Sequence, residues 1–153
     1  MELKKFLREV DTFSALTDAE LEKIVALCRE RALQKGETVF NERDPGDKLF
    51  IIESGAIEIA KSNGGGQPTR IAILEHGEIF GELAIFEERA RSSSAVAARE
   101  GRVRLIEKKD IDALLATDPV LAVKILKGLL KKTAARLRLA DEAIQTLIRS
   151  FDA

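Results

Sequence analysis

The spacing of hydrophobic residues changes twice along this chain, and the changes divide it into three parts. In the first part, apolar residues recur every three or four positions, which is typical of one face of an amphipathic helix. That face holds Leu21, Ile24, Val25 and Cys28. Thr17 or Ser14 suits the N-cap of this helix, and Gly36 suits its end. We therefore expect residues of about 1–35 to be helical.

In the second part, about residues 36–108, hydrophobic and polar residues alternate in short runs rich in β-branched side chains. KLFIIESG and AIEIAK are typical of separate strands, as are SAVAARE and GRVRLIEK. Turn sequences such as RDPGD, SNGGGQP and EHGE separate the runs, and SNGGGQP is typical of a hairpin loop. The only helical interruption is GELAIF, residues 81–86. The pattern predicts an α+β fold built on an antiparallel β-roll or jelly-roll barrel.

Helical spacing returns in the last part of the chain. It predicts one short helix over residues 109–118, broken at Asp118–Pro119, and one long helix over residues 119–150. Steps of four and three residues along the long helix make a heptad seam of Leu126, Leu130, Thr133, Leu137, Ala140, Ile144, Leu147 and Phe151. Such a seam packs either on the chain's own barrel or on a partner helix, and its length favours self-association.

Composition places these elements in one globular domain, residues 1–153, with 45% hydrophobic and 33% charged residues. A formal net charge of −1 gives no general attraction to nucleic acid or to an anionic membrane. The single cysteine, Cys28, excludes an internal disulfide and a multi-cysteine metal site. The N-terminus lacks the apolar core of a signal peptide, and no apolar run approaches the roughly 20 residues that span a bilayer. We therefore expect a cytoplasmic protein that makes no membrane contact.

Residues with the chemistry of a catalyst are few. His76 is the only histidine, and in the polar turn LEHGE it has neither further ligand candidates nor a nucleophile beside it. The sequence thus predicts no enzyme, no metal site and no cofactor. Basic residues on the long helix lack interleaved aromatic residues, which favours a solvated surface over a nucleic-acid interface. They are Lys124, Lys127, Lys131, Lys132, Arg136 and Arg138.

The segment GELAIFEERARSSSA, residues 81–95, has the chemistry of an anion site. Gly81 begins a short helix whose first amides lack intrahelical partners, and Arg91 follows closely enough for a returning strand to bring its guanidinium to the same place. Glu82 can only accept hydrogen bonds when ionised, so it suits a hydroxyl of the same ligand, and Ser92 adds a donor. A phosphate beside a ribose hydroxyl describes a nucleotide. The alternative is a structural salt bridge between Glu82 and Arg91 across a turn.

The motif F-G-E-L-A, a short gap and then R-S-x-S-A resembles the phosphate-binding cassette of the cyclic nucleotide-binding domain family. LQKGETVFNERDPGDKLFIIESGAIEIA also resembles the family's early strands, and the likeness covers roughly residues 10–150. The resemblance implies that Glu82 accepts the ribose 2′-hydroxyl and that Arg91 pairs with the cyclic phosphate. It also implies that Gly81, Leu83 and Ala84 donate backbone amides to the phosphate and that Ser92 donates to phosphate or guanine. The residues expected to line the sugar and base are Ile59, Ile71 and Ala72.

The same resemblance makes the long helix a lid whose base-contacting position falls near Ala140. Activator-type members carry a hydroxyl residue at that position, where this chain has Ala140. Ser92 keeps guanine recognition open. Cyclic AMP and cyclic GMP are therefore both candidates, with cyclic AMP favoured. The implied function is a regulatory sensor that signals through rearrangement of the C-terminal helix, as a homodimer or through an effector protein. No helix-turn-helix sequence follows, so we expect a stand-alone domain that does not read DNA. The alternative is a scaffold that keeps the fold, binds no nucleotide, and acts through dimer or partner contacts.

Overall fold

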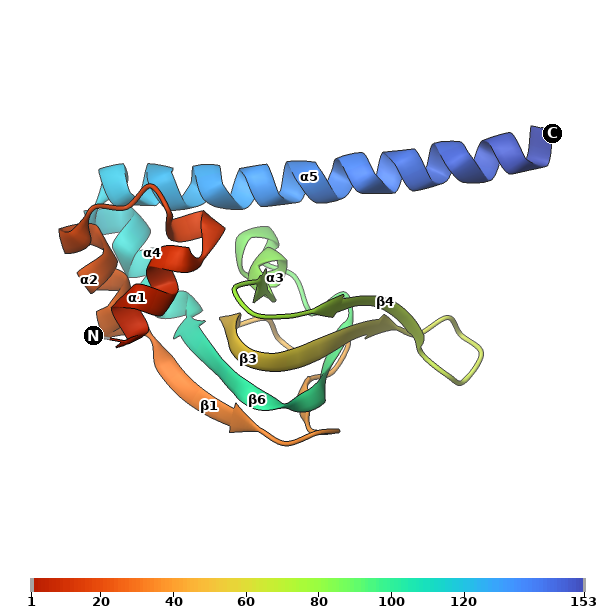
Figure 1. Ribbon diagram of the computed structural model, residues 1–153, viewed down its shortest axis with the longest axis horizontal. Helices are drawn as coiled ribbons and strands as arrows, with labels where there is room; N and C mark the ends of the chain where they lie inside the picture. Colours follow the sequence, from red (N-terminus) through yellow and green to blue (C-terminus); the bar gives the residue numbers. More distant parts are fainter. Residues whose placement is uncertain (1, 153) are drawn as a thin grey trace.

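The computed structural model describes residues 2–152 and begins with three short helical elements. These are α1 (Glu2–Glu9), the 3-10 helix η1 (Asp11–Phe13) and α2 (Asp18–Leu27). Six strands follow, interrupted once by a helix: β1 (Arg29–Leu33), β2 (Thr38–Phe40), β3 (Lys48–Lys61), β4 (Thr69–Leu74), β5 (Ile79–Phe80), α3 (Glu82–Glu87) and β6 (Ser94–Glu107). Two helices, α4 (Lys108–Thr117) and α5 (Pro119–Asp152), complete the chain. In Figure 1, α3 lies on the side of the sheet that faces α5.

All strand pairs are antiparallel, and the sheet follows the order β1-β6-β3-β4, with β2 also on β6 and β5 also on β3. The predicted fold class, an antiparallel β-roll with N-terminal helices, a short helix within it and a long C-terminal helix, is confirmed. Residues 48–61 and 94–107 each form one long strand, whereas the sequence predicted two in each place. The pairing register shifts around Ser54–Ile57, so β3 bends there without ending.

The prediction that residues 1–35 are helical is wrong for the last part of that range. Thr17 does cap α2, because its Oγ1 accepts from the amide of Glu20 (3.2 Å) while a Glu20 carboxylate oxygen accepts from the amide of Thr17 (2.9 Å). The helix nevertheless ends at Leu27, and residues 29–33 pair with 101–105 of β6. RERAL has no β-branched residue, so its strand conformation comes from pairing with β6 and not from local preference.

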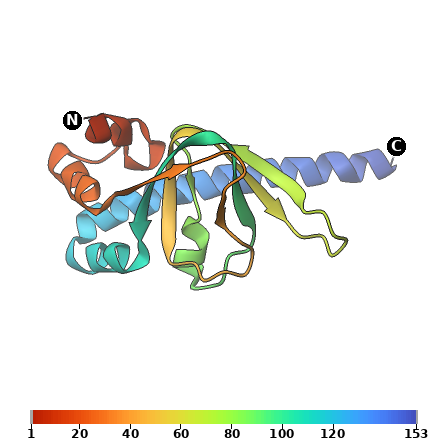
Figure 2. The same cartoon turned by 90° about the horizontal axis from the view of Figure 1, so that it is seen from below.

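Hydrophobic packing fixes only the first part of α5. Leu121, Ala122, Ile125 and Leu129 are buried, and the three larger side chains among them share a core with the N-terminal helices. Gly128 lies directly against η1, because a Cβ atom on it would lie 2.7 Å from the Thr12 carbonyl oxygen. From Leu130 onward the large apolar side chains of α5 are exposed, and the helix continues past the β-roll (Figures 1 and 2). Within residues 2–152, no helix has the length and apolar character needed to cross a membrane.

Candidate functional site

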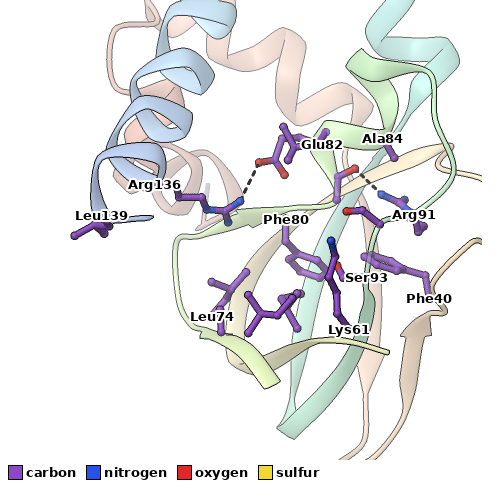
Figure 3. Close-up of a pocket in the computed structure, with 16 residues that line it drawn as sticks. Phe40, Lys61, Leu74, Phe80, Glu82, Ala84, Arg91, Ser93, Arg136 and Leu139 are labelled. Atoms are coloured by element: carbon purple, nitrogen blue, oxygen red, sulfur yellow. Dashed lines mark hydrogen bonds and ion pairs between the residues drawn. The ribbon is translucent and has the colours of Figure 1, made fainter. Parts of the chain in front are cut away.

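A cavity of about 420 Å³ opens between the β-roll, α3 and α5 (Figure 3). Its volume is in the range of small-molecule sites. Mostly apolar side chains line it, with a few polar or charged groups among them. The lining residues are Phe40, Ile59, Lys61, Ile71, Ala72, Leu74, Phe80, Gly81, Glu82, Leu83, Ala84, Arg91, Ser92, Ser93, Arg136 and Leu139.

Gly81 shapes the α3 end of this cavity. Its φ of +78° is left-handed, a conformation that residues with a side chain rarely adopt, and it precedes α3 without a side-chain cap. A Cβ atom at this position would lie 2.7 Å from Nη1 of Arg91. Glycine therefore serves two purposes here, since it allows the turn into α3 and leaves space for the guanidinium.

Arg91 is a buried cation that forms no ion pair with any of residues 2–152. It is 5% exposed, and its Nη1 and Nη2 donate to the carbonyl oxygens of Gly81 (2.5 Å) and Lys48 (2.6 Å). The guanidinium carbon lies 4.2 Å from the centre of the Phe40 ring. Among residues 2–152, no carboxylate lies within salt-bridge distance of it, and its buried Nε–H has no hydrogen-bond partner. Burial lowers the pKa of Arg91, an effect that Asp47, Glu82 and Asp44 oppose.

Glu82 is a buried anion whose partner comes from α5. It is 3% exposed, and its Oε1 accepts from Nζ of Lys132 at 2.9 Å. Nη1 of Arg136 lies 4.0 Å from the same oxygen, and Figure 3 shows the two side chains pointing toward each other. Lys132 also donates to the carbonyl oxygen of Ile79. The salt bridge between Glu82 and Arg91, considered as an alternative from the sequence, does not form.

Lys132 was assigned to a solvated surface from the sequence, and that assignment is wrong for this residue. Its side chain is 21% exposed, and burial lowers its pKa, an effect that the Glu82 charge opposes. Arg136 also lines the cavity. A signal was present in the sequence, because Lys132 and Arg136 precede the expected lid position at four-residue steps and so share its helical face.

Every residue predicted to bind the ligand lines the cavity except Ala140. On α5 the lining consists of Arg136 and Leu139, the residue directly before Ala140. The sequence also missed the aromatic and polar lining. It comprises Phe40, Lys61, Phe80 and Ser93, and the apolar Leu74 was missed as well. The roles of the lining residues toward a ligand stay predictions.

A second cavity, of about 680 Å³, lies between η1, the turn before β5 and α5. It is larger and has several basic residues, but Lys124 and Lys132 are already paired with Glu20 (2.6 Å) and Glu82. Its lining contains no buried side-chain atom without a hydrogen-bond partner, within the part of the chain that the structure describes. The free buried donor of Arg91 therefore assigns the candidate site to the smaller cavity.

The model of the cyclic nucleotide-binding domain matches residues 30–118, a range that holds β1 to α4 and the whole α3 end of the cavity. The chain belongs to the cyclic nucleotide-binding domain family. Within this family it is 30% identical over 135 residues to the cyclic AMP receptor protein of Thermus thermophilus, covering 88% of this chain and 61% of that one. The chain thus spans about three fifths of that relative.

Solved structures of the family have the same fold. A cyclic nucleotide-binding domain from Methylobacillus flagellatus superposes with a TM-score of 0.82 at 26% identity, over 94% of this chain and 80% of the other. The regulatory domain of Toxoplasma gondii PKA, solved with cAMP, superposes with a TM-score of 0.73 at 26% identity, over 87% of this chain and 48% of the other. The family's fold therefore extends beyond the matched residues into α5.

Proposed function

We propose that the cavity binds a cyclic nucleotide and that this binding is a regulatory signal, with no chemical step. The observation that carries the proposal is Arg91. A guanidinium buried without an anion is costly, and its unpartnered Nε–H makes the cost greater. A cyclic phosphate supplies the missing negative charge, and the amides at the start of α3 lie beside it.

Glu82 gives the proposal its second contact. Its carboxylate lines the same cavity as Arg91 and accepts hydrogen bonds from donors. A ribose 2′-hydroxyl is such a donor, and in a cyclic nucleotide it lies next to the phosphate. The sugar and base then contact the apolar part of the lining, with Leu139 of α5 over them.

We propose cyclic AMP as the preferred ligand over cyclic GMP. Two relatives support this preference, since the Thermus protein is a cyclic AMP receptor protein and a Mycobacterium tuberculosis relative, 33% identical over 114 residues, is a cAMP-activated regulator. Ser92 lines the cavity and is the one hydroxyl that we would assign to guanine. The ratio of the two affinities is therefore part of the test.

We propose that α5 transmits the signal. It forms one wall of the cavity through Arg136 and Leu139, and it carries exposed apolar residues beyond the β-roll. If a second copy of the chain packs against those residues, ligand binding would be coupled to the arrangement of the dimer. Coupling between two such events is typically worth about 1–3 kcal/mol.

Ligand-induced thermal stabilisation tests the function. The purified protein is heated with cyclic AMP, cyclic GMP or 5′-AMP at millimolar concentration. A ligand at about 100 times its Kd stabilises the folded state by about 2.7 kcal/mol, so both cyclic nucleotides should raise Tm by several degrees, cyclic AMP more. If no cyclic nucleotide raises Tm more than 5′-AMP does, the domain acts as a scaffold that does not bind cyclic nucleotide.

A further inference from the structure

We propose that Lys132 is a positioning residue of the nucleotide site: it holds the Glu82 carboxylate in place as an acceptor for the ribose 2′-hydroxyl. The inference rests on the proposed function of the cavity and adds a residue of α5 to it. Lys132 does not line the cavity, so it acts on the ligand only through Glu82. Recognition of the sugar then depends on where α5 lies.

The first observation is the burial of the Glu82–Lys132 pair. Among the ion pairs in residues 2–152, Glu82 has the least exposed carboxylate, with 4% of its side chain accessible. A carboxylate removed from water in this way needs a cation or several hydrogen-bond donors beside it, because a buried charge without a partner is costly. The acceptor at this site therefore requires a cation beside it.

The second observation is that Lys132 occupies only one of the two carboxylate oxygens of Glu82. Lys132 Nζ lies 2.9 Å from Oε1, whereas the nearest atom of Arg136 lies 4.0 Å from it, beyond hydrogen-bond distance. No hydrogen bond from residues 2–152 reaches Oε2. One carboxylate can accept on both oxygens at once, so the lysine and a ribose hydroxyl can occupy Glu82 together. Lys132 is therefore a support for the ligand and not a competitor.

The third observation is that Lys132 is itself fixed. Its Nζ also donates to the carbonyl oxygen of Ile79, directly before the turn into α3. The ammonium is thus held by a strand and by a helix at the same time. Its neighbour Lys131 is exposed and makes no ion pair with any of residues 2–152, so it provides a matched control.

The consequence is a link between the ribose and α5. A shift of α5 that withdraws Lys132 leaves Glu82 buried without its cation, which weakens the acceptor. Binding of the 2′-hydroxyl and the observed position of α5 therefore stabilise each other. This coupling requires the 2′-hydroxyl. A ligand without that hydroxyl therefore separates the coupling from the contacts that the phosphate and the base make.

A double-mutant cycle tests the proposal, with Lys132 changed in the protein and the 2′-hydroxyl removed from the ligand. Equilibrium dialysis measures the affinity of wild type and Lys132→Met for cyclic AMP and for 2′-deoxy cyclic AMP. Hydrogen bonds to charged groups typically change affinity by about 10- to 100-fold, so Lys132→Met should lose about that much for cyclic AMP. It should lose less than about threefold for the 2′-deoxy ligand, because the interaction it supports is absent.

Lys132→Arg should restore most of the affinity for cyclic AMP, and Lys131→Met should leave both affinities unchanged. Lys132→Gln carries the same comparison if the methionine variant does not fold, as judged by its melting curve. Equal losses for both ligands would show a merely structural lysine and overturn the proposal. A wild-type protein that binds neither ligand would instead overturn the function of the cavity, and this inference with it.

Discussion

At the scale of single residues, the site combines one buried cation that lacks an anion with one buried anion that has a cation. Arg91 is held by two backbone carbonyl groups and by the Phe40 ring, so its guanidinium is oriented before any ligand arrives. Glu82 is held by its ion pair with Lys132 of α5. Preorganised charges of opposite sign in one cavity suit a ligand that has both an anionic group and a hydroxyl donor.

Replacement of Arg91 is therefore expected to abolish binding of the phosphate. Arg91→Ala should weaken cyclic AMP binding by about a hundredfold to a few thousandfold, about 3–5 kcal/mol, because the phosphate would be desolvated without a cation. Arg91→Lys keeps the charge but not the planar fork, so it should retain only part of the affinity. Calorimetric titration measures both variants beside Arg89→Ala, which lies outside the cavity lining. Unchanged affinity in folded Arg91→Ala would exclude Arg91 as the phosphate ligand.

His76 should make stability depend on pH. Its Nδ1 donates to the Glu53 carbonyl oxygen (2.8 Å), and Nε2 lies 3.5 Å from a Glu9 carboxylate oxygen. The Glu53 hydrogen bond, and after it Glu9, raise the pKa of His76 above its ordinary value of about 6.5. The folded state thus favours the protonated ring. This stabilisation is fully present below the ordinary pKa and is lost as pH rises through the raised one.

Urea unfolding of wild type and His76→Gln at pH 5.5 and pH 8.5 measures this effect. The difference in the free energy of unfolding between the two proteins should be larger at pH 5.5. The comparison between pH values removes the pH-independent loss of ring contact with Phe6. Equal differences at both pH values would contradict a raised pKa.

At the scale of elements, the sequence predicted those parts whose signals are local. The heptad spacing and the Asp118–Pro119 break located α5, and the turn sequences located the hairpin loop between β3 and β4. Residues 29–33 became β1 because of pairing with β6, 70 or so positions later, which no local pattern contains. The partner of Glu82 was missed although Lys132 shares a helical face with the expected lid position, because only tertiary packing brings that face to Glu82.

Gly128 fixes α5 against η1, and its replacement should destabilise the fold. In Gly128→Val the new side chain would meet the Thr12 backbone, where a Cβ would lie 2.7 Å from the carbonyl oxygen. Overpacking of this kind costs about 1–3 kcal/mol, more than the helix gains by losing glycine. Ala134→Val, at an exposed position of the same helix, should cost only a few tenths. Urea denaturation that ranks the two variants equally would contradict the contact.

At the scale of the whole molecule, α5 joins a fixed part to a projecting part (Figure 1). Its start is buried in the core, its middle forms a wall of the cavity, and its end carries exposed apolar residues. Those at heptad spacing are Leu130, Leu137, Ile144, Leu147 and Phe151. An exposed seam of this kind is typical of a helix that packs on a partner.

The proposed dimer is tested on this seam. Leu137→Glu combined with Ile144→Glu should convert the dimer to monomer, because each chain would bring two charges into the buried interface. Sedimentation velocity measures the mass, and Arg138→Glu, beside the seam on the same helix, is the control. A wild-type protein that sediments as a monomer at every concentration would exclude self-association through α5.

The central claim is that this domain binds cyclic nucleotide through Arg91 and Glu82, and equilibrium dialysis against cyclic AMP tests it most directly. A ligand of this size, held by one charge pair and an apolar lining, should bind once per chain with a Kd of about a micromolar. Cyclic GMP should bind more weakly. No bound nucleotide at millimolar concentration of either ligand, with the protein folded, would contradict the account and leave α5 as the functional surface.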